Sequence, residues 1–153
     1  MKRCLLFVFI ITAVVANAQA TKNKPATTET VIPKVAVSIG GYKGGNISGD
    51  ILSNIVDSAI TVKDGKGIAY EVVRFRVLYK FKSTYDDPET GQKKAFNDMR
   101  TNDFTNTPNI SELWRQSIKD NIKGGDEMIL DNIIVRLKNG TKLMAPSLTF
   151  KVI

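Results

Sequence analysis

The stretch IAYEVVRFRVLYKFK, residues 68–82, alternates apolar and charged side chains over most of its length. This period of two is typical of a β-strand with one buried face and one solvated face. The predicted inner side chains are Val73, Phe75, Val77, Tyr79 and Phe81, and the predicted outer ones are Arg74, Arg76, Lys80 and Lys82, with Leu78 among them. A long strand with two such faces favours an antiparallel sheet as the centre of the fold.

Further strands are predicted on both sides of this stretch. Alternation or β-branched side chains indicate strands at residues 35–39, 58–63, 128–137 and 148–152. The turn sequence YDDPETG, residues 85–91, predicts that residues 94–100 return as a hairpin partner. Its acidic residues are interpreted as an exposed turn, with weak calcium binding as the alternative.

Two details of the strand at 128–137 are also predicted. Ile129, Ile133, Val135 and Leu137 are expected on one side of it. Asn139-Gly140 then predicts a two-residue hairpin loop with positive φ at both positions.

One amphipathic helix is predicted near residue 115. Apolar side chains and one serine recur there at helical spacing, at Ile110, Leu113, Trp114, Ser117, Ile118 and Ile122. Thr107-Pro108, and Asn109 with Glu112, indicate its start, and the glycines after Lys123 indicate its end. Trp114 is expected in the core. Residues 47–55 are ambiguous, with a short helical turn starting at Ser48 or Asp50. The predicted class is α+β and mostly β: an antiparallel sheet or sandwich-like domain with one packed amphipathic helix.

The first twenty residues have the features of a secretory signal peptide. Lys2 and Arg3 precede an apolar run over residues 5–16, and Ala18 and Ala20 have the spacing that signal peptidase accepts. The run is shorter than the roughly 20 residues that span a bilayer, so a cleaved leader is favoured over an anchor. We therefore expect a signal peptide at 1–20, a flexible linker at 21–32, a domain at 33–153, and a periplasmic or secreted product.

Composition excludes several kinds of chemistry. The chain has no histidine, and its one cysteine, Cys4, lies in the predicted leader. Ser-His and Cys-His catalytic pairs and histidine or cysteine zinc sites are excluded, so we expect no enzyme, cofactor or metal. Catalysis by carboxylates alone is the alternative. The formal charge of +7 falls to +5 when Lys2 and Arg3 leave with the leader. This charge suits an anionic surface, but no nucleic-acid motif is present.

The sequence GGYKGG at residues 40–45 matches neither a P-loop nor a dinucleotide fingerprint. Its glycines, Gly40, Gly41, Gly44 and Gly45, are expected to need positive φ or a close approach, in a bend or bulge at a sheet edge. An anion contact through Lys43 and free N–H groups is the alternative.

The cations of the long strand are a candidate docking face. Arg74, Arg76, Lys80 and Lys82 would form a row that could bind an acidic partner. The alternative is a solvated face or a guarded sheet edge.

Several landmarks, taken in order, resemble one known family. They are residues 33–37 leading into 40–47, residues 73–77, the stretch 118–126, residues 131–133 with 139–141, and the ending at 146–152. This order is similar to that of the C-terminal domain of GldM, a periplasmic component of the gliding and type IX secretion machinery of Bacteroidetes. The resemblance implies a protein-interaction module that docks onto ring proteins near the outer membrane. The GldM family has further domains and a membrane-spanning helix ahead of its C-terminal domain. Because the resemblance covers only the C-terminal domain, it implies the docking surface and not the motor. Binding of peptidoglycan or lipopolysaccharide is the alternative function.

Overall fold

A sheet of eight strands is the main feature of residues 32–153, the part of the chain that the computed structural model describes. The elements in chain order are β1 (Val35–Ile39), β2 (Gly45–Ile47), α1 (Gly49–Ile55), β3 (Ile60–Asp64), β4 (Ala69–Asp86), β5 (Lys93–Thr105), α2 (Glu112–Asn121), β6 (Glu127–Arg136), β7 (Lys142–Met144) and β8 (Leu148–Val152). The predicted signal peptide, and the linker as far as residue 31, lie outside the described residues.

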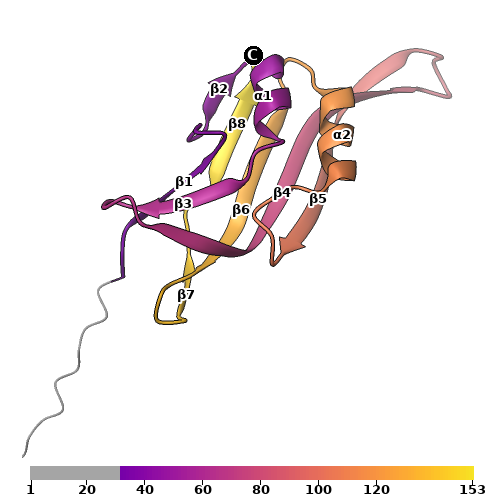
Figure 1. Cartoon of the computed structure of the whole chain (residues 1–153). Coiled ribbons are helices and arrows are strands. Elements are labelled where there is room, and N and C mark those ends of the chain that lie inside the picture. Colours follow the sequence, from indigo (N-terminus) through magenta and orange to yellow (C-terminus); the bar gives the residue numbers. More distant parts are fainter. Residues whose placement is uncertain (1–31) are drawn as a thin grey trace, which may run out of the picture. The chain divides into compact units, whose positions relative to one another are not determined.

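The strand order is β1-β3-β4-β6-β8-β2, with β5 on β4 and β7 on β6 (Figure 1). β1 and β2 are therefore at opposite ends of the order, although only residues 40–44 separate them in the chain. A five-residue link reaches at most about 20 Å, so the sheet must curl until its two ends approach each other. The curled sheet and its helices confirm the mostly-β α+β class. Its β2–β8 pair is parallel, however, and α1 is a second helix.

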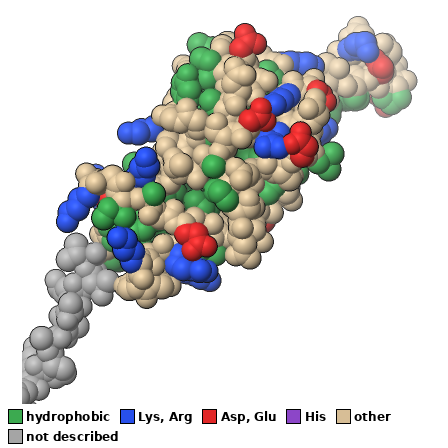
Figure 2. Space-filling view, viewed as in Figure 1, with side chains coloured by type: hydrophobic (Ala, Val, Ile, Leu, Met, Phe, Trp, Pro, Cys, Tyr) green, Lys and Arg blue, Asp and Glu red, His purple; other side chains and the backbone are tan. Residues whose placement is uncertain are grey.

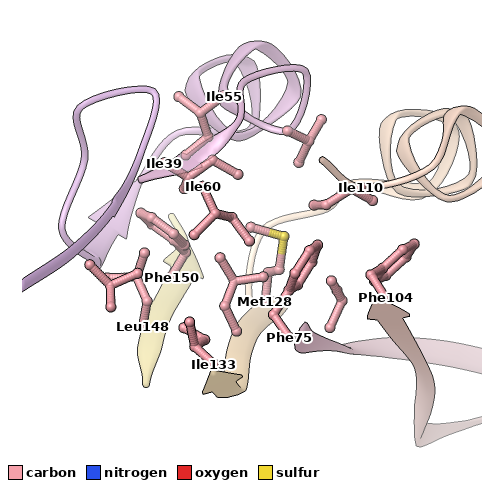
Figure 3. Packing of buried hydrophobic residues seen from close by; sticks show 14 of the residues in the cluster. Ile39, Ile55, Ile60, Phe75, Phe104, Ile110, Met128, Ile133, Leu148 and Phe150 are labelled. Carbon is pink, nitrogen blue, oxygen red and sulfur yellow. The ribbon is translucent and has the colours of Figure 1, made fainter. Parts of the chain in front are cut away.

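The inner side of the curl holds one hydrophobic core (Figure 3). Phe75 of β4, Met128 of β6 and Phe150 of β8 are fully buried there, together with Leu52 of α1 and Ile118 of α2. The alternation predicted for β1 and β8 is confirmed, because every second side chain of these strands faces this core.

Two irregularities shift the inward pattern of β4 and β6. Between Val72 and Arg74 the extra residue lies on β4, and between Arg74 and Arg76 it lies on β6. Asn132 has a φ of 49° within the second one. The two offset each other, so the register recovers. As a result, Val72 is buried in place of Val73, and Met128 and Leu130 are buried in place of Ile129. The sequence prediction was wrong at these positions because a bulge reverses the alternation.

The predicted start of the long helix was also wrong. α2 begins at Glu112 with Ser111 as its N-cap, and the Thr107 hydroxyl instead accepts a hydrogen bond from the Asn109 N–H. Ile110 is buried ahead of the helix, whereas Leu113 is 80% exposed. The apolar stripe is therefore shorter than its spacing predicted.

The β6–β7 hairpin is confirmed, but its loop differs from the predicted one. The Leu137 N–H donates to the Thr141 carbonyl, so three residues form the loop. Gly140 has a φ of 83°, and Asn139 is not among the positive-φ residues. This is the three-residue type of hairpin, in which only the last loop position is left-handed.

Candidate docking surface

The hairpin of β4 and β5 continues beyond the rest of the sheet. β4 pairs with β6 as far as Lys80, whereas its pairing with β5 continues to Asp86 and Lys93. We call the projecting part, residues 81–98, the arm (Figure 1). The predicted hairpin is thus confirmed, and β5 is longer than the expected 94–100. A two-stranded ribbon is marginally stable alone, so the arm depends on its own side-chain contacts.

Asp87 holds the tip of the arm together. Its carboxylate accepts hydrogen bonds from the N–H groups of Glu89 and Thr90 and pairs with Lys94. Asp86 pairs with Lys93 across the same turn at 3.2 Å. The predicted turn is confirmed, but Asp87 is buried rather than exposed. Among residues 32–153 no cluster of acidic side chains has the arrangement of a metal site.

Acid is expected to loosen the tip of the arm. The Lys94 ammonium, followed by the Glu89 N–H, lowers the pKa of Asp87 below its ordinary value. A lowered folded-state pKa means that Asp87 stabilises the fold fully above its ordinary pKa and that this contribution is lost as the pH falls through the folded value. The protection factors of the Glu89 and Thr90 amides, which are the intrinsic exchange rates divided by the observed ones, should fall in that window when they are followed by NMR from pH 6 to 2. Asp87→Asn should have lower protection factors at pH 6, with little further change as the pH falls; an identical pH profile of protection in the two proteins would contradict this role.

One face of the arm carries aromatic side chains. Phe81 and Tyr85 of β4 and Phe96 of β5 lie on this face, which continues the face of β4 that carries Tyr79. The Tyr85 and Phe96 rings meet edge to face at 5.8 Å, and the Tyr79 and Phe81 rings stack at 5.7 Å. Tyr85 and Phe96 are nevertheless 47% and 41% exposed. Figure 2 shows hydrophobic and charged side chains mixed on the projecting end. Exposed aromatic groups that continue from a core are typical of interaction surfaces.

A groove of about 320 Å³ lies where α2 packs beside this face, and we call it the α2 groove. Tyr79, Arg100, Leu113, Trp114, Ser117 and Ile118 line it. Trp114 is half-buried, and its ring meets Phe104 edge-on at 6.3 Å. The tryptophan expected in the core therefore packs against the core with one side and lines a groove with the other.

Tyr79, which lines the α2 groove, also makes a buried polar contact. Its hydroxyl donates to Asp126 Oδ2 at 2.6 Å, and the Lys123 N–H donates to the same oxygen at 2.9 Å. Burial, followed by the Asp126 carboxylate, raises the pKa of the Tyr79 phenol. Asp126 is 1% exposed, and its Oδ1 has no hydrogen-bond partner in the described structure. The chain therefore tolerates a costly buried carboxylate where β4 meets the segment between α2 and β6.

The predicted cation row is largely paired with acids. Arg74 and Arg76 both contact Asp103 Oδ1, at 3.1 and 3.3 Å, and Lys80 contacts Glu127 at 2.9 Å. Within residues 32–153, Lys82 alone of the four has no ion pair. These partners come from the neighbouring strands β5 and β6, so the row forms cross-strand ion pairs instead of a uniformly positive face.

The glycine loop joins the two ends of the sheet. Gly40, Gly41, Gly44 and Gly45 all have positive φ, as predicted. The N–H of Tyr42 donates to the Ile39 carbonyl and the N–H of Ile39 donates to the Tyr42 carbonyl, closing a tight turn. Lys43 is exposed, and its contact with an anion stays a prediction.

Sequence reasoning missed the residues that form the α2 groove. Arg100 was expected only as part of a return strand, and Leu113 only as part of the apolar stripe of the helix. The pairing of Tyr79 with Asp126 joins positions 47 apart in the chain, and no local pattern indicates it. No described helix is long and apolar enough to cross a membrane.

Comparison of the chain with known protein families finds no match. Comparison with curated proteins finds none either.

Proposed function

We propose that this chain is a non-catalytic protein-interaction module of the bacterial envelope that docks through the arm and the neighbouring α2 groove. The observation that carries the proposal is the exposed aromatic face of the arm, with Tyr85 and Phe96 at its outer end. Aromatic side chains provide large contact areas at low entropic cost, and they dominate binding energy at interfaces.

The resemblance to the GldM tip domain supports the choice of partner. We propose that the partner is a ring protein of the gliding and type IX secretion machinery near the outer membrane, and that this chain meets it in the periplasm. The ion pairs of Arg74, Arg76 and Lys80 argue against the anionic-surface alternative, because paired cations attract lipopolysaccharide or peptidoglycan less than free ones do.

Removing the aromatic end of the arm is expected to weaken docking. The double substitution Tyr85→Ser and Phe96→Ser should reduce affinity for the ring protein at least about tenfold, the usual size of an aromatic hot spot. The melting temperature of the domain should change little, because both side chains lie in the arm, beyond the part of the sheet that covers the core. Biolayer interferometry at physiological salt measures the affinity. Met144→Ser, on β7 and 68% exposed, is the matched control and should bind normally.

Two results would count against this function. Unchanged affinity of the double variant for the ring protein would show that the arm is not part of the interface. Capture of lipopolysaccharide or peptidoglycan that disappears at high salt, without any capture of the ring protein, would favour the binder of an anionic envelope component.

A further inference from the structure

Arg100 differs from the other arginines of β4 and β5 in having no acidic partner. Its guanidinium lies 4.9 Å from the centre of the Phe81 ring, and its Nη1 donates to Ser117 Oγ at 3.0 Å. Arg74 and Arg76 share Asp103, but no carboxylate within the described residues pairs with Arg100. The stacking and the hydroxyl contact hold the cation in position while most of its N–H donors stay free.

The rest of the α2 groove is apolar. Ile118 is buried, Trp114 presents one side of its ring, and Leu113 stands 80% exposed at the rim. The volume of about 320 Å³ is at the small end of the range for ligand sites. Such a volume suits one or two large apolar side chains rather than an extended cofactor.

We infer that the α2 groove binds a partner protein segment in which a large apolar side chain is followed directly by an aspartate or glutamate. The apolar side chain enters between Leu113 and Trp114, and the carboxylate pairs with Arg100. Charge complementarity selects this occupant, because a fixed, unpaired guanidinium beside an apolar site favours an adjacent acid. This inference rests on the proposed function, since it names the chemistry of the partner at the same surface.

Intrinsic fluorescence offers a direct test, because Trp114 is the only tryptophan of the chain. The probe is the capped peptide acetyl-Ser-Gly-Phe-Asp-Gly-Ser-amide, titrated into the full protein. We expect a saturable change in Trp114 emission at millimolar peptide. The Phe-Asn analogue should bind about tenfold more weakly, because it cannot form the charged pair.

Protein variants complete the test. Arg100→Gln should lose about tenfold in affinity for the Phe-Asp peptide and show no preference over the Phe-Asn analogue. Arg136→Gln, which removes a similarly exposed arginine paired with Glu71, should bind normally. Arg100→Lys should recover part of the preference. Thermal melts should show that every variant is folded, because Arg100 and Arg136 are both exposed.

The inference would be overturned by no emission change up to millimolar peptide, by equal binding of both peptides, or by equal binding of the Phe-Asp peptide to Arg100→Gln. A chain terminus could also supply the carboxylate that pairs with Arg100, and a peptide whose only acid is its C-terminal carboxylate tests this. Tighter binding of that peptide than of the Phe-Asp peptide would contradict the inference that the acid is an internal aspartate or glutamate. Self-association that Arg100→Gln abolishes would make a second copy the occupant. If ring-protein binding needs Tyr85 and Phe96 but not Arg100, the proposed function stands and this inference fails.

Discussion

Alanine at Gly44 is expected to lower the free energy of unfolding by about 3 kcal/mol. Gly44 has a φ of 94°, and an added Cβ would lie 2.7 Å from the Thr149 carbonyl oxygen. Thr149 is part of β8, which is hydrogen-bonded to both β2 and β6, so neither backbone can move away freely. The midpoint of urea unfolding should fall while the slope stays constant.

Gly41→Ala is the matched control for this substitution. Gly41 has a φ of 85°, but an added Cβ would meet no atom within 4 Å. It should therefore lose only the roughly 1 kcal/mol of left-handed backbone strain. Equal losses of unfolding free energy in Gly44→Ala and Gly41→Ala would mean that the close approach of Gly44 to β8 does not contribute to the cost of the substitution.

Removing the hydroxyl of Tyr79 is expected to cost about 2–3 kcal/mol, because it deprives a buried carboxylate of one of its two hydrogen bonds. Tyr79→Phe keeps the ring and its packing, so urea unfolding isolates the polar contact. The raised pKa of Tyr79 adds a pH signature. The stability it provides is complete below about pH 10 and declines at higher pH, and Tyr79→Phe should lack this alkaline decline.

Tyr70→Phe provides the comparison. Its hydroxyl donates to Asp64 Oδ2 at 2.9 Å, a similar contact in a partly exposed setting. Its loss should cost well under 1 kcal/mol, because water can replace the missing donor. A Tyr79→Phe effect as small as that of Tyr70→Phe would show that Asp126 does not depend on this hydrogen bond.

The sequence predicts the sheet well because burial on one face imposes a period of two. Phe75, Val77, Leu148 and Phe150 face the core as that period requires. The period does not reveal bulges. The extra residues near Val73 and Asn132 reverse the alternation locally, and β6 therefore buries Met128 instead of Ile129.

The helices were predicted less accurately for a different reason. Spacing at three and four residues does not distinguish a side chain that packs from one that is exposed, so the predicted apolar stripe included Leu113, which is exposed. Helix-start signals at Thr107 and Asn109 competed with Ser111, whose backbone takes the N-cap conformation without a side-chain hydrogen bond.

The candidate docking site depends on contacts between distant segments. The alternation of residues 68–82 identifies a basic row, but the acids that pair with it, Asp103 and Glu127, come from other strands. Arg100, which has no acidic partner among residues 32–153, is recognised only when β5 and α2 are placed together. The docking face expected from sequence and the one that we now propose therefore lie on opposite faces of β4.

Site-specific photocrosslinking in the bacterium that produces the protein tests the central claim most directly. A photoreactive amino acid is introduced at Leu113, at Tyr85 or, as a control, at Met144, all of which are exposed. Our account predicts that Leu113 and Tyr85 become attached to the same envelope protein, and that Met144 does not. Attachment only at Met144, or attachment of lipid or glycan in place of protein at all three positions, would contradict it.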